Sequence, residues 1–351
     1  MTTAEPSLPP LDLHAPTLDP LALAAELMAA ESTSGAEGPA IDRMEAVLLA
    51  RGWRVTRIPV TPGRDDLFAE GELPAEVTFS THLDTVPPYI APRIAGDRLL
   101  GRGACDAKGI AAAMVCAAER LRARGVPVGL LFVVGEETAH DGAHAADAAQ
   151  PRIAPRNRVL INGEPTESLL GTGTKGALRF TLRTAGRACH SAYPELGRSA
   201  IQSLARLVVE LDSLPLPSDP VLGATTINVG SVSGGVADNV VPPSAEARLM
   251  ARLVGPQHEL ETVLEAWVAG RATVTFGITV PAVRLGTVPG FRTGVVAFAT
   301  DIPALGAWGT PYLYGPGSIH VAHTDDEYIE IAELREAVDA YVRLASAAVG
   351  E

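Results

Sequence analysis

Short runs of apolar residues recur along the chain, and several of them lead directly to a histidine or an acidic residue. Continuous apolar runs of this length are typical of strands that are buried on both faces of a sheet. The four runs of this kind are 76–80, 128–134, 158–162 and 311–314. An alanine-rich segment at 107–124 lies between the first two runs and favours a helix. This alternation of strands and helices predicts an α/β fold with a largely parallel sheet.

The chain before the first of these runs is predicted from helical and strand periodicity. Apolar spacing predicts helices at 21–28 and 41–51, and a strand follows at 53–60. Residues 1–19 are rich in proline and threonine, so we expect them to form a loose lead-in.

The pattern changes in the middle of the chain. Residues 178–184 alternate between apolar and polar, as a half-exposed strand does. The elements predicted after this strand are a helix at 198–214, strands at 225–232 and 245–254, a helix at 257–269 and a strand at 272–280. The order β-α-β-β-α-β is the ferredoxin-like pattern. We therefore expect an α+β domain at 178–285, inserted into a first domain that is made of 1–177 and 286–351.

Composition excludes several classes of protein. The 351 residues include 47% hydrophobic and 20% charged residues, which is an ordinary globular mixture rather than a disordered one. A net charge of −13 and only 5% aromatic residues argue against a protein that binds nucleic acid or an anionic membrane. The longest apolar stretches, of about ten residues, are too short for a transmembrane helix. Three cysteines without close spacing and the lack of a signal-like N-terminus lead us to expect a cytoplasmic protein.

The candidate chemistry begins at the ends of the predicted strands. His82 and Asp84 stand two residues apart after the first run, and a carboxylate at that spacing can support a metal-binding imidazole. Asp106 lies in the glycine-rich turn GRGACDAKG before the long helix, where it is either a helix cap or a metal ligand. Glu136 and Glu137 follow the most apolar strand, where two adjacent carboxylates repel each other unless a cation offsets their charge.

Two further segments repeat the pattern of an apolar run followed by a polar residue. Glu164 follows the third run, and His323 lies in a loop beside acidic residues after the fourth. His320 competes with His323, and spacing alone does not separate them. Mixed imidazole and carboxylate ligands suit zinc, with cobalt or manganese as alternatives. The neighbours in Cys189-His190-Ser191 are not expected to form a catalytic pair, because such partners meet in space and not along the chain.

Taken together, these residues form a set of recognisable segments. In chain order they are HLDTVP, GRGACDAKG, GEE, GEP, GRACHSAYPELGRSAI and GPGSIHVAHTDDEYI. They resemble the family of acetylornithine deacetylases, succinyl-diaminopimelate desuccinylases, aminoacylases and related carboxypeptidases, which are dinuclear zinc metallopeptidases. The resemblance implies a zinc-exopeptidase-like catalytic domain, with 178–285 as an inserted dimerisation or lid domain, and it implies a homodimer.

The resemblance also implies a role for each site residue. Two zinc ions per subunit would be bridged by Asp106, with cobalt or manganese as substitutes. One ion would add His82 and Glu164, and the other would add Glu137 and His323. Asp84 would orient His82, and Glu136 would be the general base that takes a proton from the attacking water. His190, from the lid of a partner subunit, would stabilise the oxyanion, while Asn239 and Arg248 would bind the substrate carboxylate.

The leading hypothesis is therefore a deacylase that cleaves the amide bond of an N-acyl amino acid, as in amino-acid biosynthesis. A carboxypeptidase or dipeptidase with the same site is the nearest alternative, and the inserted domain is compatible with both. A catalytically silent relative that binds a metabolite or a metal is a remote alternative, because it would have no need of Glu136 beside an intact ligand set.

Only two of the 28 basic residues are lysine. Composition bias explains the excess of arginine, but it does not explain where the two lysines remain. Lys108 lies two residues from Asp106, and Lys175 lies just before the inserted domain. We expect that a compact, flexible ammonium group is needed at these two positions.

Overall fold

The computed structural model describes residues 7–350, and the chain forms two compact units. The first unit contains residues up to Thr172, together with Leu285–Gly294 and the residues from Thr300 onward. The second unit contains Gly173–Arg284 and Val295–Ala299. Each unit has its own hydrophobic core, so each is described separately below.

The first unit is built on a six-stranded sheet with the order β1-β2-β6-β3-β7-β17. Its strands are β1 (Arg54–Thr61), β2 (Arg64–Glu70), β3 (Val77–His82), β6 (Val128–Val133), β7 (Val159–Asn162) and β17 (Thr310–Leu313). Strands β6, β3, β7 and β17 are parallel, as the apolar runs predict. The sheet as a whole is mixed, because β2 pairs in the antiparallel direction with both β1 and β6. The sequence did not reveal β2 because it starts with three charged residues.

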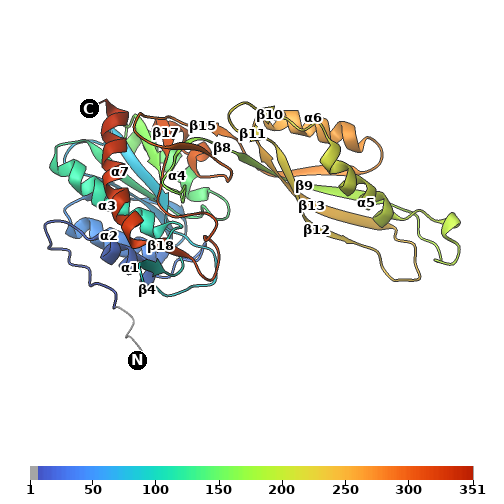
Figure 1. Ribbon diagram of the computed structural model, residues 1–351, viewed down its shortest axis with the longest axis horizontal. Helices are drawn as coiled ribbons and strands as arrows, with labels where there is room; N and C mark the ends of the chain where they lie inside the picture. Colours follow the sequence, from blue (N-terminus) through green and yellow to red (C-terminus); the bar gives the residue numbers. More distant parts are fainter. Residues whose placement is uncertain (1–6, 351) are drawn as a thin grey trace. The chain divides into compact units, whose positions relative to one another are not determined.

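Helices cover both faces of this sheet (Figure 1). They are α1 (Pro20–Ala29), α2 (Gly38–Ala50), α3 (Lys108–Ala123), α4 (Asp141–Ile153) and α7 (Ile331–Val349). Leu130 and Phe132 of β6 belong to the core with α1, α2, α3 and α7, while Leu131 and Val133 belong to a second core with α4. Successive side chains of a strand point to opposite faces, so β6 contributes to both layers. This explains why its sequence is apolar without alternation.

The N-terminal segment is more ordered than its composition suggests. Residues 7–19 contain no helix or strand, yet Leu8, Leu11 and Leu13 pack against the main core. The prediction of a loose lead-in is therefore wrong for this part, because three spaced leucines are partly buried against the core. Residues 1–6 of the predicted lead-in lie outside the described residues.

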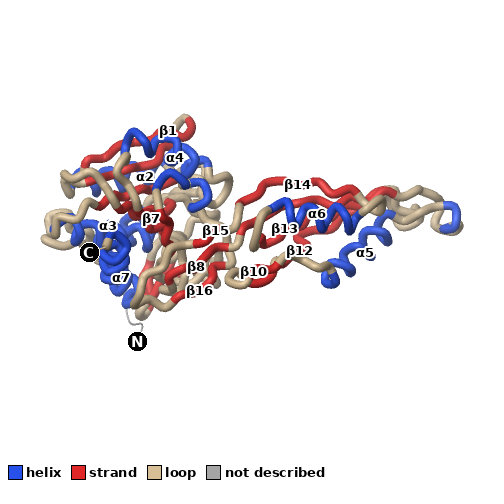
Figure 2. Tube along the Cα trace, turned by 90° about the horizontal axis from the view of Figure 1, so that it is seen from above, coloured by secondary structure: helices blue, strands red, loops and turns tan. Residues whose placement is uncertain are grey.

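The second unit contains a four-stranded antiparallel sheet with the order β12-β13-β9-β14, whose long strands run beside one another in Figure 2. Its elements in chain order are β9 (Gly176–Ala185), α5 (Ala200–Glu210), β12 (Thr226–Gly234), β13 (Ser244–Leu253), α6 (Gln257–Val268) and β14 (Thr273–Val280). The predicted β-α-β-β-α-β order is confirmed. Buried residues of α5 and α6 share one core with alternate residues of the strands, so the opposite face of the sheet is open and polar.

Several short strands complete the chain. The sheet β18-β5-β4 contains β18 (Tyr328–Glu330), β5 (Arg98–Leu100) and β4 (Arg93–Ala95), and its strand β18 follows the loop that carries His323. The sheet β15-β8-β16 contains β15 (Val283–Arg284), β8 (Leu170–Thr174) and β16 (Thr293–Val296), and β10 (Ser218–Asp219) pairs with β11 (Gly223–Ala224). None of the helices in the described part of the chain is long and apolar enough to cross a membrane.

Candidate metal centre

The carboxyl ends of the parallel strands bring the candidate ligands to one edge of the sheet. His82 is the last residue of β3, Glu136 and Glu137 follow β6, and Glu164 follows β7. Parallel strands end at the same edge of a sheet, which is where α/β folds place their sites. Asp106 reaches this edge from the loop before α3.

Two groups of ligand atoms meet at this edge, and Asp106 belongs to both. Atoms of His82, Asp106 and Glu164 all lie within 4.8 Å of one another, and so do atoms of Asp106, Glu137 and His323. The Asp106 carboxylate faces a different imidazole with each oxygen. Its Oδ1 is 3.0 Å from His82 Nε2, and its Oδ2 is 3.2 Å from His323 Nε2. A carboxylate held in this way has the geometry of a bridge between two cations.

The structure also separates the two candidate histidines of the last segment. His323 Nε2 lies 2.9 Å from Glu137 Oε1 and joins the second ligand group. The His320 side chain is 82% exposed and lies 3.8 Å from Glu167 Oε1. His323 therefore fits the candidate centre and His320 does not.

The electrostatics of the site fit a bound cation. Burial raises the pKa of the Glu164 carboxyl well above its usual value, and its Oε1 atom is buried without a hydrogen-bond partner among the described residues. Burial opposes the charged form of Asp106, yet hydrogen bonds from His323 and His82 lower its pKa. Hydrogen bonds to Asp106 and Glu137 raise the pKa of His323 to about 10. The raised pKa values mean that the Glu164 carboxyl and the His323 imidazole hold protons at the atoms that would bind a metal. Metal binding is therefore expected to release these protons.

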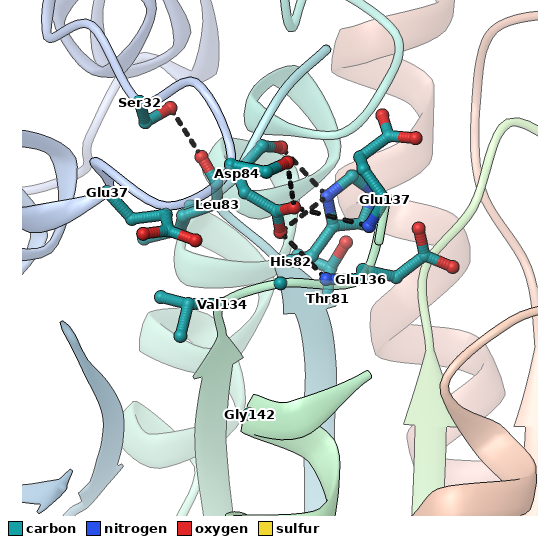
Figure 3. A network of polar contacts seen from close by, with 12 residues as sticks. Ser32, Glu37, Thr81, His82, Leu83, Asp84, Val134, Glu136, Glu137 and Gly142 are labelled. Atoms are coloured by element: carbon teal, nitrogen blue, oxygen red, sulfur yellow. Dashed lines mark hydrogen bonds and ion pairs between the residues drawn. The ribbon is translucent and has the colours of Figure 1, made fainter. Parts of the chain in front are cut away.

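Asp84 supports the site in a different way from the one expected. His82 Nδ1 donates to the backbone carbonyl of Asp84 at 2.9 Å, whereas the nearest Asp84 carboxylate oxygen is 3.5 Å away. The carboxylate itself accepts from the backbone N–H groups of Glu136 and Glu137 at 3.1 and 3.2 Å (Figure 3). It also accepts from the Ser34 hydroxyl at 2.7 Å. Asp84 thus leaves His82 Nε2 free to bind a metal and also fixes the loop that carries the two glutamates.

Glu327 is a supporting residue that the sequence reasoning missed, because it was considered only as one of the acids near His323. It is buried, and its Oε1 accepts from the backbone N–H groups of Gly103, Cys105 and Asp106 at 3.0, 3.3 and 3.3 Å. Its Oε2 lies 2.6 Å from the buried Arg102 guanidinium. Glu327 therefore holds the loop that presents Asp106.

We predict that Glu327→Gln weakens both the fold and metal binding. The substitution leaves the buried Arg102 without its anionic partner, and breaking a buried pair costs about 3–5 kcal/mol. Thermal unfolding and zinc titration of the apoprotein would measure the two effects. The neighbouring exposed Asp326→Asn is the control, and equal behaviour of the two variants would argue against this role.

The two lysines differ in their surroundings. Lys108 is 2% exposed, its Nζ donates to the Ala30 carbonyl at 2.5 Å, and burial lowers its pKa to about 7. A Cβ at Gly103 would lie 3.0 Å from Lys108 Cδ, so this side chain fills a closely packed space. Lys175 is half-buried, and its Nζ donates to the Ala224 carbonyl at 2.6 Å in a solvent-exposed contact.

Lys108→Arg is therefore predicted to destabilise the protein by about 1–3 kcal/mol, the range for overpacking a filled core. Lys175→Arg is the matched control and should change stability by less than about 0.5 kcal/mol, because the ammonium group of Lys175 bonds in a solvent-exposed contact. Urea unfolding would measure both. Equal stability of the two variants would mean that Lys108 has no special packing requirement.

The remaining predicted site residues lie in the second unit. His190 and Asn239 come from adjacent segments, because His190 bridges to Val240 and the Asn239 carbonyl accepts from Ser191 N–H at 2.9 Å. Both side chains are exposed. Arg248 lies on the open face of β13, where its side chain is 76% exposed and pairs with Glu246 at 3.2 Å.

Arg252 lies on the same face of β13 and was not singled out from the sequence. Its side chain is half-buried, and burial together with the nearby Arg179 lowers its pKa. Arg252 has no ion pair within residues 7–350, in contrast to Arg248. An arginine beside another arginine and without an acidic partner is better prepared to receive an anion than one that is already paired.

Comparisons with known proteins agree with this architecture. A family described as the peptidase dimerisation domain matches residues 172–274. A probable carboxypeptidase of Aspergillus fumigatus is 37% identical, and the match covers 92% of this chain and 85% of the relative. A peptidase M20 domain-containing protein of Schizosaccharomyces pombe is 36% identical over 92% of this chain and 83% of its own length.

Solved structures share the fold across nearly the whole chain. A tripeptidase from Staphylococcus aureus has a TM-score of 0.78 and 18% identity, covering 95% of this chain and 98% of its own. A dinuclear metal-binding peptidase of the M20 family from Bacillus subtilis has a TM-score of 0.68 and 15% identity, covering 93% and 96%. The protein is thus a hydrolase of the metallopeptidase class. It belongs to the M20 peptidase family, and the fold expected from the sequence segments is confirmed.

Proposed function

We propose that the protein is a zinc-dependent hydrolase that cleaves an amide bond and releases an amino acid with a free carboxylate. The observation that carries this proposal is the Asp106 carboxylate, which faces the imidazoles of two separate ligand groups. The first group would hold one zinc through His82 and Glu164, and the second would hold another through Glu137 and His323. When bound, two such ions activate a water and polarise the scissile carbonyl.

The residues of the chain supply the remaining steps. Glu136 is half-buried, and burial and the neighbouring Glu164 raise its pKa well above the usual value, which suits a group that must accept and return a proton. In the proposed reaction it takes a proton from the attacking water and passes it to the leaving amine. His190 of a partner subunit stabilises the oxyanion in a homodimer formed through the second unit. The dimerisation-domain match supports this assembly.

The acyl side of the substrate distinguishes two forms of this proposal. A carboxypeptidase is supported by the 37% identical relative of that name, while a deacylase of N-acyl amino acids uses the same site and the same leaving group. A hydrolysis panel with zinc- or cobalt-loaded protein separates them. It should contain dipeptides and tripeptides, acetylornithine, acetylcitrulline and succinyl-diaminopimelate, and the same peptides with an amidated C-terminus.

We expect cleavage of substrates with a free carboxylate and little cleavage of the amidated peptides. Peptide cleavage alone would establish the carboxypeptidase form, and cleavage of acyl amino acids alone would establish the deacylase form. If the loaded protein cleaves none of these compounds, the amide-hydrolase proposal fails. Gel filtration of the same preparation tests the homodimer.

Two arginines compete for the role of binding the substrate carboxylate. Arg248 and Asn239 are the residues expected from the resemblance, and Arg252 is the alternative that the sheet geometry adds. We predict that the arginine in contact with substrate raises KM by about 10–200-fold when replaced by alanine, since charge-assisted bonds contribute about 1.5–3 kcal/mol. Comparing Arg248→Ala with Arg252→Ala on one good substrate decides between the two arginines. An unchanged KM in both variants would show that this face of the sheet does not bind the substrate carboxylate.

A further inference from the structure

A third group of possible ligand atoms lies beside the two described above. Glu136, His140 and Asp301 each offer one ligand atom, and these three atoms lie within 4.8 Å of one another. Neither His140 nor Asp301 has a role in the proposed reaction, and neither belongs to the segments that carry the family resemblance. All three residues belong to the first unit.

The backbone fixes two of these side chains on a single turn. The N–H groups of Thr138, Ala139 and His140 all donate to the Gly135 carbonyl, at 3.3, 3.1 and 2.8 Å. This turn places Glu136 and His140 on one short, rigid loop just before α4. His140 Nδ1 lies 2.8 Å from Asp301 Oδ1, and Asp301 is only 1% exposed.

The charges around this group do not balance. Asp66 lies at 0% exposure, and its Oδ1 accepts from Val134 N–H at 3.0 Å, while its Oδ2 has no hydrogen-bond partner among residues 7–350. Burial raises the pKa of Asp66, and the negative charge of Asp301 raises it further. Arg64, whose positive charge lowers the pKa of Asp66, is already paired with Glu37 and Asp141. His140 thus faces the carboxyl groups of Glu136 and Asp301, and the charge of Asp301 also acts on the buried Asp66. This is an excess of negative charge that a divalent cation would offset.

We propose that Glu136, His140 and Asp301 form a third, inhibitory site for a divalent cation such as zinc. One imidazole and two carboxylates are the donor set that zinc prefers in sites without cysteine. Occupation of this site engages the Glu136 carboxylate, so the side chain is no longer free to accept a proton. The inhibitory part of this inference rests on the proposed function of Glu136 as the general base, whereas the binding part does not.

The binding part is tested by equilibrium dialysis of the full chain against increasing zinc, with metal analysis of the protein. We expect the wild type to bind a third equivalent after the first two, and His140→Gln and Asp301→Asn to bind only two. His144→Gln is the matched control, because His144 is an exposed imidazole on the following turn of α4, and this variant should still bind three. A third equivalent that persists in His140→Gln, or a wild type that saturates at two, would overturn the proposal.

The inhibitory part is tested by activity at rising zinc, with each protein compared to its own rate at two equivalents. The wild type and His144→Gln should lose activity at excess zinc, and the inhibitory concentration should rise at least tenfold in His140→Gln. If His140→Gln lowers kcat equally at every zinc concentration, His140 acts in the reaction and not in an inhibitory site. Dialysis needs no substrate, so failure of the proposed hydrolase function leaves the third equivalent measurable. Because Asp301 is buried, thermal unfolding of Asp301→Asn must show a folded protein, and His140→Gln provides the independent variant.

Discussion

Glu136→Gln is expected to lower kcat by about 10²–10⁴-fold, the range that general acid–base catalysis contributes. Glutamine has nearly the same size and can make similar hydrogen bonds, but its amide does not accept a proton from the attacking water. The two groups of metal ligands, which contain Asp106 in common, do not include Glu136. The metal content at two equivalents should therefore remain near that of the wild type.

The measurement pairs steady-state kinetics with metal analysis of the same sample. Glu167→Gln is the matched control, because Glu167 is a half-exposed glutamate near His320 whose charge the proposed reaction does not use. Wild-type kcat in Glu136→Gln would remove Glu136 from the role of base. A loss of metal at two equivalents together with activity would instead make Glu136 a ligand of the two-metal centre.

The candidate site could be predicted from the sequence because its residues follow strands that are easy to recognise. The run at 128–134 is apolar throughout, since β6 is covered by helices on both faces, and the two glutamates stand at its end. Because parallel strands end at the same edge of a sheet, the carboxyl ends of these strands lie together, and no knowledge of the tertiary structure is needed to predict this. His323 and His320 were not separable in the same way, because both lie in a loop and only the tertiary structure turns one of them toward Asp106.

The elements and contacts that were missed depend on tertiary context. Strand β2 begins with Arg64, Asp65 and Asp66, which reads as a polar loop in the sequence. The charge of Arg64 is tolerated because this residue pairs with Glu37 and Asp141, which lie 27 and 77 positions away. The carboxylate of Glu327 accepts hydrogen bonds from backbone N–H groups that lie 221–224 positions earlier in the chain. No local sequence pattern encodes such a contact.

Asp106→Asn is expected to have the other large effect, and it differs in kind from the effect of Glu136→Gln. The asparagine side chain would keep the size of the aspartate but lose its charge and one of the two oxygens that face His82 and His323. A bridging ligand serves both ions, so its loss should lower metal affinity by more than the roughly 10–100-fold seen when an outer-shell partner is removed. Activity should then fall with metal content at limiting zinc.

Metal titration with a competing chelator measures this affinity, and kcat is recorded at each zinc concentration. Asp325→Asn is the control, since Asp325 is an exposed acid in the loop that carries His323. Retention of two tightly bound ions in Asp106→Asn would show that Asp106 does not bridge them, and the dinuclear proposal would then fail even if the protein hydrolyses amides. Loss of metal in Asp106→Asn, together with retention of metal in Glu136→Gln, separates the two roles. Metal binding then depends on Asp106, whose carboxylate belongs to both ligand groups. Turnover depends on Glu136, which belongs to neither of them.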